Sequence, residues 1–414
     1  MMVKNKLCAI LNLTEDDQLL KPLTQNRPIA ALPFADRYRV IDFALSSICH
    51  AEIDSVALFI AESGRSIYDH IRSGAAWDLD SQVSGGIFTF SQQNWKLRHH
   101  QENLYEDYYY NHRVFMARAK AEYVFVAGSK IIANVDIRGV FRHHVAEGKD
   151  ITLIYKQLDK EKLGDQNPKS RALKFDANRQ VQGLVEYGDL REEEKVDASL
   201  SMYLLSVKTL NDIIDRAVDE EVYMEVDELI QHYLLDYTVN PYKYTGYMAN
   251  IDSIQRYYKA NMDMLDRQNF TSLFYSSQPI LTKTKNGVPS YYAPSSDVRS
   301  SVVASGSYLA GKVERSLISR KVHVSEGAHV KESIILQGTK IGDGARVEYA
   351  ILDKGCVVEP GAHVIGTPDN VVVISKNTVI PAESRSRHES FICFRRSGTL
   401  FQNGWARRRC LCLA

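Results

Sequence analysis

The sequence predicts a two-part protein, with an α/β domain built on a mostly parallel sheet and a parallel β-helix after it. In the first part, apolar runs rich in β-branched and aromatic residues alternate with helix-length segments, which is typical of strands buried on both faces. In the second part, Ile and Val recur every six residues, the repeat of a triangular β-helix. We therefore divide the chain into residues 1–240, a connector at 241–295, a β-helix at 296–383 and a tail at 384–414.

The first domain should open with a strand, a loop, a helix and a second strand. We place the two strands at Leu7–Leu11 and Val56–Ile60, and we begin the helix after Arg39. Nucleotide-binding α/β domains begin in this order, and the loop after the first strand receives the phosphates. Here that loop is Thr14–Gln18, which has three carboxylates and no glycine. The next strands are expected at Tyr123–Gly128, Ile151–Tyr155 and Ser201–Ser206.

The β-helix is predicted from the length of its repeat, and glycines keep the same phase in EGAHV, IGDGARV and EPGAHV. His323, His329 and His363 fall within these repeats, which favours a structural role over that of the base in a hexapeptide acyltransferase. The period stops near residue 383, and the tail after it has seven arginines and three cysteines. A poorly ordered end, a basic anion-binding segment and an altered reading frame all remain open for this tail.

The overall charge argues against two classes of partner. Lys and Arg number 51, as do Asp and Glu, so there is no electrostatic case for nucleic-acid or membrane binding. No apolar run approaches the roughly 20 residues of a membrane span, and we expect a cytoplasmic protein. Cys8, Cys49 and Cys356 are scattered, which predicts reduced residues rather than a disulfide framework.

A family resemblance is carried by PLTQNRPIAALPFADRYRVIDFALSS, from Pro22 to Ser47. This segment closely resembles the PLTxxRAKPAVPFGGxYRxIDFALSN stretch of bacterial glucose-1-phosphate adenylyltransferases, the ADP-glucose pyrophosphorylases. Arg118–Ser129, Ala198–Ser206 and Gly246–Leu265 resemble further motifs of the family in the same order. The resemblance implies a nucleotidyltransferase-like, Rossmann-like domain with a left-handed β-helix. It also implies the family's reaction, in which ATP and glucose 1-phosphate give ADP-glucose and pyrophosphate with Mg²⁺ for glycogen biosynthesis.

The positions that carry the family's chemistry are changed in this chain. The glycines of the family's GGxGxRL loop fall on Thr14, Glu15 and Asp17. The other changed positions are Leu19 for the arginine of that loop, Ile29 for the lysine of RAKPAV, Ser129 for the metal-binding Asp of GDH, Tyr187 for the lysine of VEKP and Asn250 for the second metal-binding Asp. A hydroxyl and an amide are poor sole ligands for a hard divalent cation. We therefore expect no catalytic residue, no metal site and no bound cofactor in this chain.

Some side chains remain candidates for residual nucleotide, sugar-phosphate or anion binding. They are Arg27, Arg37, Arg39, Asp107 and Glu186. The three arginines lie close together around an apolar segment, and ion pairs with Asp36 and Asp42 are the alternative. Asp107 and Glu186 match acidic residues of the family's motifs.

Two other groups suggest sites and have a plainer alternative. His99–His100 and His143–His144 contain possible metal ligands, but adjacent residues of a strand point to opposite faces and no Cys/His cluster joins them. Tyr105 and Tyr108–Tyr110 offer rings for stacking a base, although packing or a subunit contact is the stronger prediction.

The chain as a whole is most similar to the GlgD-type subunits of the family, which are catalytically degenerate and accompany a catalytic subunit. This resemblance implies a regulatory subunit of a heterotetramer whose catalytic partner binds Mg²⁺. A self-sufficient nucleotidyltransferase with a rearranged site and a scaffold without ligand remain as alternatives.

Overall fold

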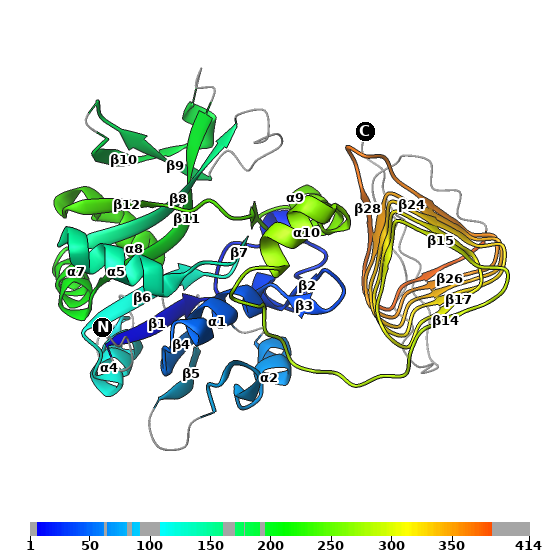
Figure 1. The fold of residues 1–414 in the computed structure, drawn as a ribbon, viewed down its shortest axis with the longest axis horizontal. Coiled ribbons are helices and arrows are strands. Elements are labelled where there is room, and N and C mark those ends of the chain that lie inside the picture. Colours follow the sequence, from blue (N-terminus) through cyan, green and yellow to red (C-terminus); the bar gives the residue numbers. More distant parts are fainter. Residues whose placement is uncertain are drawn as a thin grey trace, which may run out of the picture.

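The computed structural model describes residues 6–61, 64–80, 85–91, 108–159, 170–177, 179–190 and 195–382. These residues form an α/β domain beside a triangular β-helix (Figure 1). The tail at 384–414, together with His99, His100, Tyr105 and Asp107, lies outside the described residues. Within the described ranges, no helix is long and apolar enough to cross a membrane.

A mixed, mostly parallel sheet forms the centre of the first domain. Its main order is β10-β9-β11-β6-β1-β4-β5, and β8 and β12 extend it beside β11. The strands are β1 (Leu7–Asn12), β4 (Ser55–Ile60), β5 (Gly86–Ser91), β6 (Tyr123–Gly128), β8 (Ile151–Asp159), β9 (Arg171–Phe175), β10 (Val181–Glu186), β11 (Lys195–Ser206) and β12 (Val239–Lys243). The run at Ser201–Ser206 belongs to β11, which is antiparallel to β6 and β8 and follows the β9–β10 hairpin along the chain.

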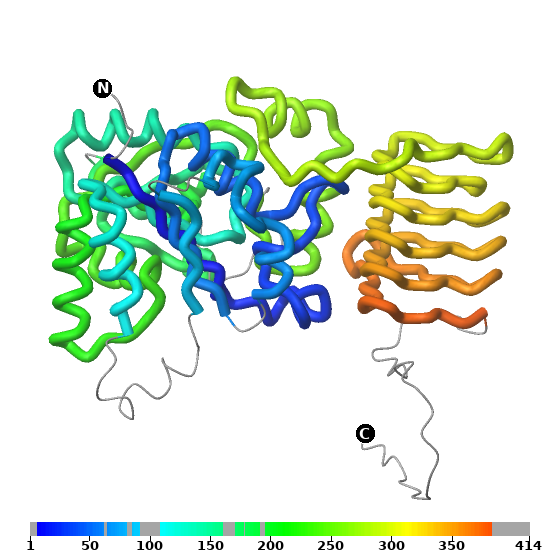
Figure 2. The backbone as a smooth tube through the Cα atoms, turned by 90° about the horizontal axis from the view of Figure 1, so that it is seen from below, coloured from blue at the N-terminus to red at the C-terminus, as the bar shows by residue number. Residues whose placement is uncertain are grey.

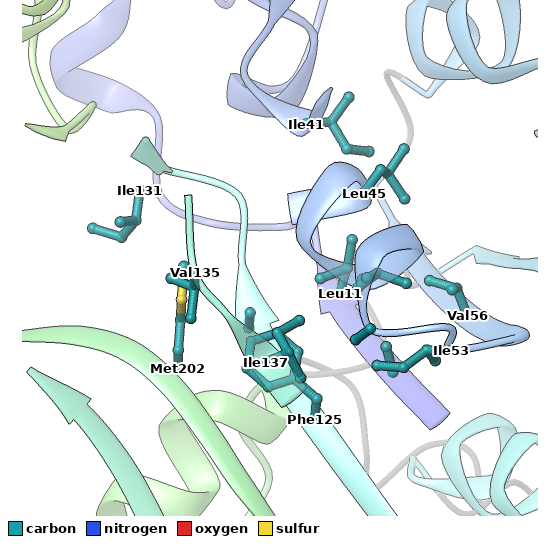
Figure 3. Packing of buried hydrophobic residues seen from close by; sticks show 14 of the residues in the cluster. Leu11, Ile41, Leu45, Ile53, Val56, Phe125, Ile131, Val135, Ile137 and Met202 are labelled. Carbon is teal, nitrogen blue, oxygen red and sulfur yellow. The ribbon is translucent and has the colours of Figure 1, made fainter. Parts of the chain in front are cut away.

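Helices cover both faces of this sheet. Their bounds are α1 (Ile41–His50), α2 (Arg65–Ile71), α4 (Tyr110–Ala119), α5 (Ile137–Glu147), α7 (Val207–Asp219) and α8 (Val226–His232). Alternate residues of β1 enter two cores: Leu11 packs with α1 and α5, whereas Ile10 packs with α4, α7 and α8. Figure 3 shows the first of these cores, where Leu11, Leu45 and Ile137 lie between the helices and the sheet. A strand buried on both faces explains the unbroken apolar run of β1.

The segment 241–295 holds ordered elements of the first domain. It contains β13 (Met248–Asn250), α9 (Ile254–Met262) and α10 (Arg267–Phe274), and β13 pairs with β7 (Ile131–Ala133). The helices α9 and α10 pack against the segment that contains β2 (Pro33–Phe34) and β3 (Tyr38–Arg39). An extended stretch after α10 then crosses to the first coil of the β-helix (Figure 2).

Three parallel sheets make the left-handed β-helix, as the hexapeptide period predicts. The first comprises β14 (Tyr291–Tyr292), β17 (Tyr308–Leu309), β20 (His323–Val324), β23 (Lys340–Ile341), β26 (Val357–Val358) and β29 (Val379–Ile380). The second comprises β15 (Asp297–Arg299), β18 (Lys312–Glu314), β21 (His329–Lys331), β24 (Arg346–Glu348) and β27 (His363–Ile365). The third comprises β16 (Val302–Val303), β19 (Leu317–Ile318), β22 (Ile334–Ile335), β25 (Ala350–Leu352) and β28 (Val372–Ile374).

The third sheet of the β-helix faces the α/β domain (Figure 1). Leu317, Ile334 and Ile351 of this sheet share one apolar cluster with Leu20 and Ile29 of the first domain. Polar contacts flank the cluster: the Tyr258 hydroxyl donates to the Glu332 carbonyl (2.6 Å), and Arg27 forms a buried ion pair with Asp353. The two domains are therefore joined by a continuous, partly apolar interface.

Candidate functional site

The loop after β1 folds over the carboxyl ends of β1 and β6. Asn12 ends β1, and its Nδ2 donates to Asp227 Oδ1 (2.8 Å). The Asn12 side-chain oxygen accepts from the backbone N–H of Thr14 (3.1 Å) and from its hydroxyl (2.5 Å). These bonds turn the chain back across the sheet edge, so the next residue, Glu15, points toward the end of β6.

The Glu15 carboxylate is bound by the residues that follow β6. Its Oε2 accepts from the backbone N–H of Ser129 (2.9 Å) and from the Ser129 hydroxyl (2.5 Å), and its Oε1 accepts from the Lys130 N–H (3.2 Å). Burial raises the pKa of Glu15, while Lys130 and the Ser129 hydrogen bonds lower it. Ser129, which the family resemblance predicts at a metal-binding position, therefore holds a carboxylate of this chain.

Further carboxylates gather at the same edge. Burial raises the pKa of Glu225 to about 7, with the charges of Asp227 and Glu228 adding to the effect and a hydrogen bond from Thr14 opposing it. Burial and Asp227 also raise the pKa of Glu228. Negative charge is concentrated where a nucleotide triphosphate would need positive charge, and this environment opposes phosphate binding.

Tyr187 and Asn250, predicted from distant parts of the sequence, meet in one polar network. Asn250 Nδ2 donates to Asp252 Oδ2 (3.1 Å), and Arg256 forms an ion pair with the same oxygen (3.0 Å). Ser170 Oγ also donates to Asp252 Oδ2 (3.0 Å). Burial raises the pKa of Tyr187, with Arg256 opposing and Asp252 adding to the shift. Arg256 is neutralised here by Asp252, so this network offers no free cation to a sugar phosphate.

These residues do not fit a magnesium ion. The two positions that the resemblance predicts for metal-binding residues carry a hydroxyl and an amide, and both oxygens of the Glu15 carboxylate, which lies beside Ser129, accept hydrogen bonds. Among the residues that the structure describes, no three His, Cys, Asp or Glu side chains are grouped to hold a metal. Mg²⁺ prefers near-octahedral oxygen ligands that include carboxylates. These side chains therefore do not support a metal-dependent step.

A second polar region lies between the two domains, and we call it the interdomain cation cluster. It comprises Arg27, Arg39, Lys285, Arg320 and Lys354. Burial lowers the pKa of Lys354 to about 7, and the charges of Arg39, Arg27 and Lys285 lower it further against the opposing effect of Asp353. Burial, Arg320 and Arg39 lower the pKa of Lys285 to about 8. The mutual repulsion of these cations indicates a region suited to an anion.

Carboxylates oppose the charge of this cluster: Asp36 acts on Arg320, and Asp42 and Asp69 act on Arg39. Arg27 pairs with Asp353, and its Nε donates to the Leu23 carbonyl (2.7 Å). Asp42 bonds His70 Nε2 (2.5 Å) and accepts from the Arg39 N–H (3.0 Å).

The candidate binding residues that the structure describes lie in different surroundings. Arg39, whose guanidinium donates to the Ser66 carbonyl (2.6 Å), belongs to the cluster with Arg27. Arg37 is exposed and lies over the Tyr38 ring, and its charge also acts on Arg320 of the cluster. Glu186 is exposed at the end of β10.

Two changed family positions lie away from the edge of the sheet. Leu19 is exposed, and Ile29 is buried in the interface between the domains.

The histidine and tyrosine groups have structural contacts in the described residues. His143 and His144 lie in α5 and not on a strand, and His144 Nδ1 bonds the Thr152 hydroxyl (2.8 Å). His329 bonds Glu314 (3.1 Å) on the neighbouring coil. Tyr109 is buried in the core, and its hydroxyl donates to the Met224 carbonyl (3.0 Å). The packing alternative holds for Tyr108 and Tyr109, whereas Tyr110 is exposed.

Sequence reasoning missed two features of this region. It treated Glu15 as a repulsive charge and did not foresee its bonds to Ser129 and Lys130. It also missed Asp353 and Lys354, which reach Arg27 from 326 and 327 positions away along the chain. No local pattern marks either feature, because the partners come together only through the tertiary fold.

Both domains of the chain match known protein families. Residues 18–267 match the model of the nucleotidyl transferase family, and residues 290–372 match the GlmU-like C-terminal hexapeptide family. The chain is 32% identical to the glycogen biosynthesis protein GlgD of Geobacillus stearothermophilus over 79% of this chain and 84% of that protein. It is 29% identical to GlgD of Bacillus subtilis (strain 168) over 80% of this chain and 84% of that protein. It is also 27% identical to the glucose-1-phosphate adenylyltransferase of Geobacillus stearothermophilus over 80% of this chain and 84% of that enzyme.

Proposed function

This chain belongs to the nucleotidyl transferase family and within it to the GlgD-like ADP-glucose pyrophosphorylases, and from this premise we propose that it is a catalytically silent, regulatory subunit in glycogen biosynthesis. Its catalytic partner would be a paralogue that converts ATP and glucose 1-phosphate into ADP-glucose and pyrophosphate. In a heterotetramer, that partner would also supply the Mg²⁺ site.

The interdomain cation cluster carries the regulatory part of the proposal. A ligand controls a protein only if it binds two states with different affinity. The cluster draws Arg39 and Lys285 from the first domain and its linker, and Arg320 and Lys354 from the β-helix. An anion between them would relieve the repulsion of all four cations at once, so it would favour the closely docked arrangement of the domains. A phosphorylated metabolite is the class of effector that suits this charge.

The silent part of the proposal rests on the changed family positions. Phosphoryl transfer depends on positioned cations and metal-binding carboxylates, and removing one electrostatic group typically costs about 10²- to 10³-fold in rate. By the family resemblance, such groups are replaced here at five positions: Leu19, Ile29, Ser129, Tyr187 and Asn250. Losses within one site do not simply add, but several of them leave no route to a useful rate.

The first test is an assay of the purified chain alone with Mg²⁺, ATP and glucose 1-phosphate. We expect no ADP-glucose above background, and robust production would instead support a self-sufficient nucleotidyltransferase. Co-expression with a catalytic paralogue should give a stable complex with altered kinetics. Separate elution with unchanged kinetics would contradict the proposed partnership.

The regulatory test uses the cluster itself. Isothermal titration with fructose 1,6-bisphosphate and with sulfate should detect binding to the wild-type chain, which the double variant Arg320→Ala/Lys354→Ala should lose. Lys208→Ala, which removes an exposed cation on α7, is the matched control and should bind as the wild type does. In the complex, the same double variant should lose the effector response. If wild type, double variant and control all fail to bind, the scaffold alternative is the better account.

A further inference from the structure

We propose that Glu15 is a built-in anion, whose carboxylate fills an anion-binding cradle at the end of β6 that a phosphate group can enter once the carboxylate is removed. We call the three donors the β6 cradle: the backbone N–H groups of Ser129 and Lys130 and the Ser129 hydroxyl. The inference rests on the proposed function, because a subunit that performs no catalysis can keep such a cradle closed.

The geometry of the β6 cradle is that of an anion site. Two successive backbone N–H groups and one hydroxyl converge on the two oxygens of one carboxylate, at distances of 2.5 to 3.2 Å. Consecutive N–H groups that form a concave surface bind carboxylate and phosphate oxygens alike. The donors directly follow β6, whose residues pair with β1 and β11, and the Lys130 carbonyl accepts from the Ile251 N–H (2.7 Å), so contacts other than those to Glu15 also hold this segment.

Gly128 provides an independent observation that the site is shaped around Glu15. A Cβ atom added to Gly128 would lie 2.2 Å from Glu15 Oε1, and the three nearest atoms to it all belong to the Glu15 side chain. Gly128 is not among the residues with positive φ, so its backbone conformation is open to other residues. The glycine is therefore required by the approach of this carboxylate and not by a turn.

The surrounding charges explain why the cradle stays closed. Lys130 attracts the Glu15 carboxylate and Asp227 repels it. Glu15 is tethered three residues after β1, and a short tether gives an effective concentration in at least the millimolar range. A free phosphate of similar intrinsic affinity must therefore exceed millimolar concentration to displace it. Removal of the Glu15 carboxylate removes the competitor and one negative charge. Asp227 and Glu228 still repel an incoming phosphate, whereas Lys130 and the donors of the β6 cradle attract it.

The binding experiment uses the full chain with the Arg320→Ala/Lys354→Ala background, so that the interdomain cation cluster does not take up the probe. Three proteins are titrated with orthophosphate and with pyrophosphate: the background with Glu15 intact, the background with Glu15→Ala and the background with Asp17→Ala. The last variant removes an equal charge from the same loop. We expect Glu15→Ala to bind at least one probe about tenfold or more tighter than the background protein, and Asp17→Ala to match the background. Addition of Ser129→Ala to Glu15→Ala should weaken the gained binding. Equal affinity for Glu15→Ala and Asp17→Ala would overturn the proposal.

A double-mutant cycle tests the closed cradle without any ligand. Gly128→Ala should lower the Tm clearly when Glu15 is present and by much less when residue 15 is alanine, because the three atoms nearest to the new methyl group all belong to Glu15. Equal losses in both backgrounds would show that Glu15 does not occupy the cradle in solution. Circular dichroism of all four proteins confirms that each is folded.

The tests of the β6 cradle and of the proposed function can fail independently of each other. A gain of pyrophosphate binding in Glu15→Ala with no effect on any catalytic partner would keep the cradle and reject the regulatory role. A regulatory effect on the partner with no gain in Glu15→Ala would reject the cradle and keep the regulatory role.

Discussion

Arg27 and Asp353 form a buried ion pair, and we predict that removing one partner destabilises the protein more than removing the other. The two side chains are only 8% and 3% exposed, so removal of either leaves a charge without its partner inside the interface. Breaking such a pair typically costs about 3–5 kcal/mol. The two losses should differ, however, because the remaining neighbours of each residue differ in charge.

Asp353 keeps favourable neighbours when Arg27 is removed. Its Oδ1 still accepts from the Lys354 N–H (2.7 Å), and the ammonium of Lys354 remains nearby. Arg27, by contrast, is left among like charges when Asp353 is removed, since Lys354 and Arg39 both act on this region. We therefore expect Arg27→Met to cost about 3 kcal/mol and Asp353→Asn to cost about 5 kcal/mol of the free energy of unfolding.

Urea unfolding followed by far-ultraviolet circular dichroism and by tryptophan fluorescence measures these costs. The double variant Arg27→Met/Asp353→Leu serves as the control, because removal of both charges should cost much less than the two single losses together. Sulfate should recover more stability in Asp353→Asn than in Arg27→Met, since it replaces the lost negative charge. Equal costs, or costs below about 1 kcal/mol, would refute the reasoning and indicate a hydrated pair.

Two further predictions concern Lys354 and the glycines of the β-helix. The pKa of Lys354, about 7 in the folded chain, lies below the value of about 10.4 expected when unfolded, so the unfolded state binds more protons between these values. The free energy of unfolding should consequently rise with pH from about 7 to 10, and Lys354→Met should flatten that rise in calorimetric scans at several pH values; an unchanged profile would contradict it. Gly338→Ala should cost about 1 kcal/mol, because φ is +75° and no atom lies within 4 Å of the new methyl group. Gly342→Ala should cost more than about 2 kcal/mol in urea unfolding, because its methyl group would lie 2.6 Å from a backbone nitrogen of the next coil; equal costs would contradict the packing argument.

Local patterns were sufficient to predict most of the fold. Buried strands such as β1 and β6 carry continuous apolar runs, and the six-residue period of the β-helix follows directly from its three flat faces. The antiparallel direction of β11 was not predictable in this way, because an apolar run has the same composition whichever way the strand points. Direction depends on the connections, which here include the β9–β10 hairpin.

For the candidate site, the sequence predicted only which functional residues of the family are replaced. Comparison of motifs located Ser129, Tyr187 and Asn250, and the structure brings Tyr187 and Asn250 into one network around Asp252. The bonds that Glu15 makes were not predictable, since they depend on N–H groups 114 and 115 positions further along the chain. Charge pairing across such distances leaves no periodic signature in a single sequence.

The repeating form of the β-helix gives the Arg27–Asp353 pair a second consequence. Successive coils present nearly the same apolar face at intervals of about 4.8 Å, so the first domain could in principle dock one coil too early. The position of Asp353 is occupied by Leu336 one coil before and by Ser319 two coils before. A shift by one coil would bury the guanidinium of Arg27 against leucine, at a cost of several kcal/mol. The buried charge of Asp353 thus fixes which coil the first domain contacts, although the apolar faces of successive coils are nearly alike.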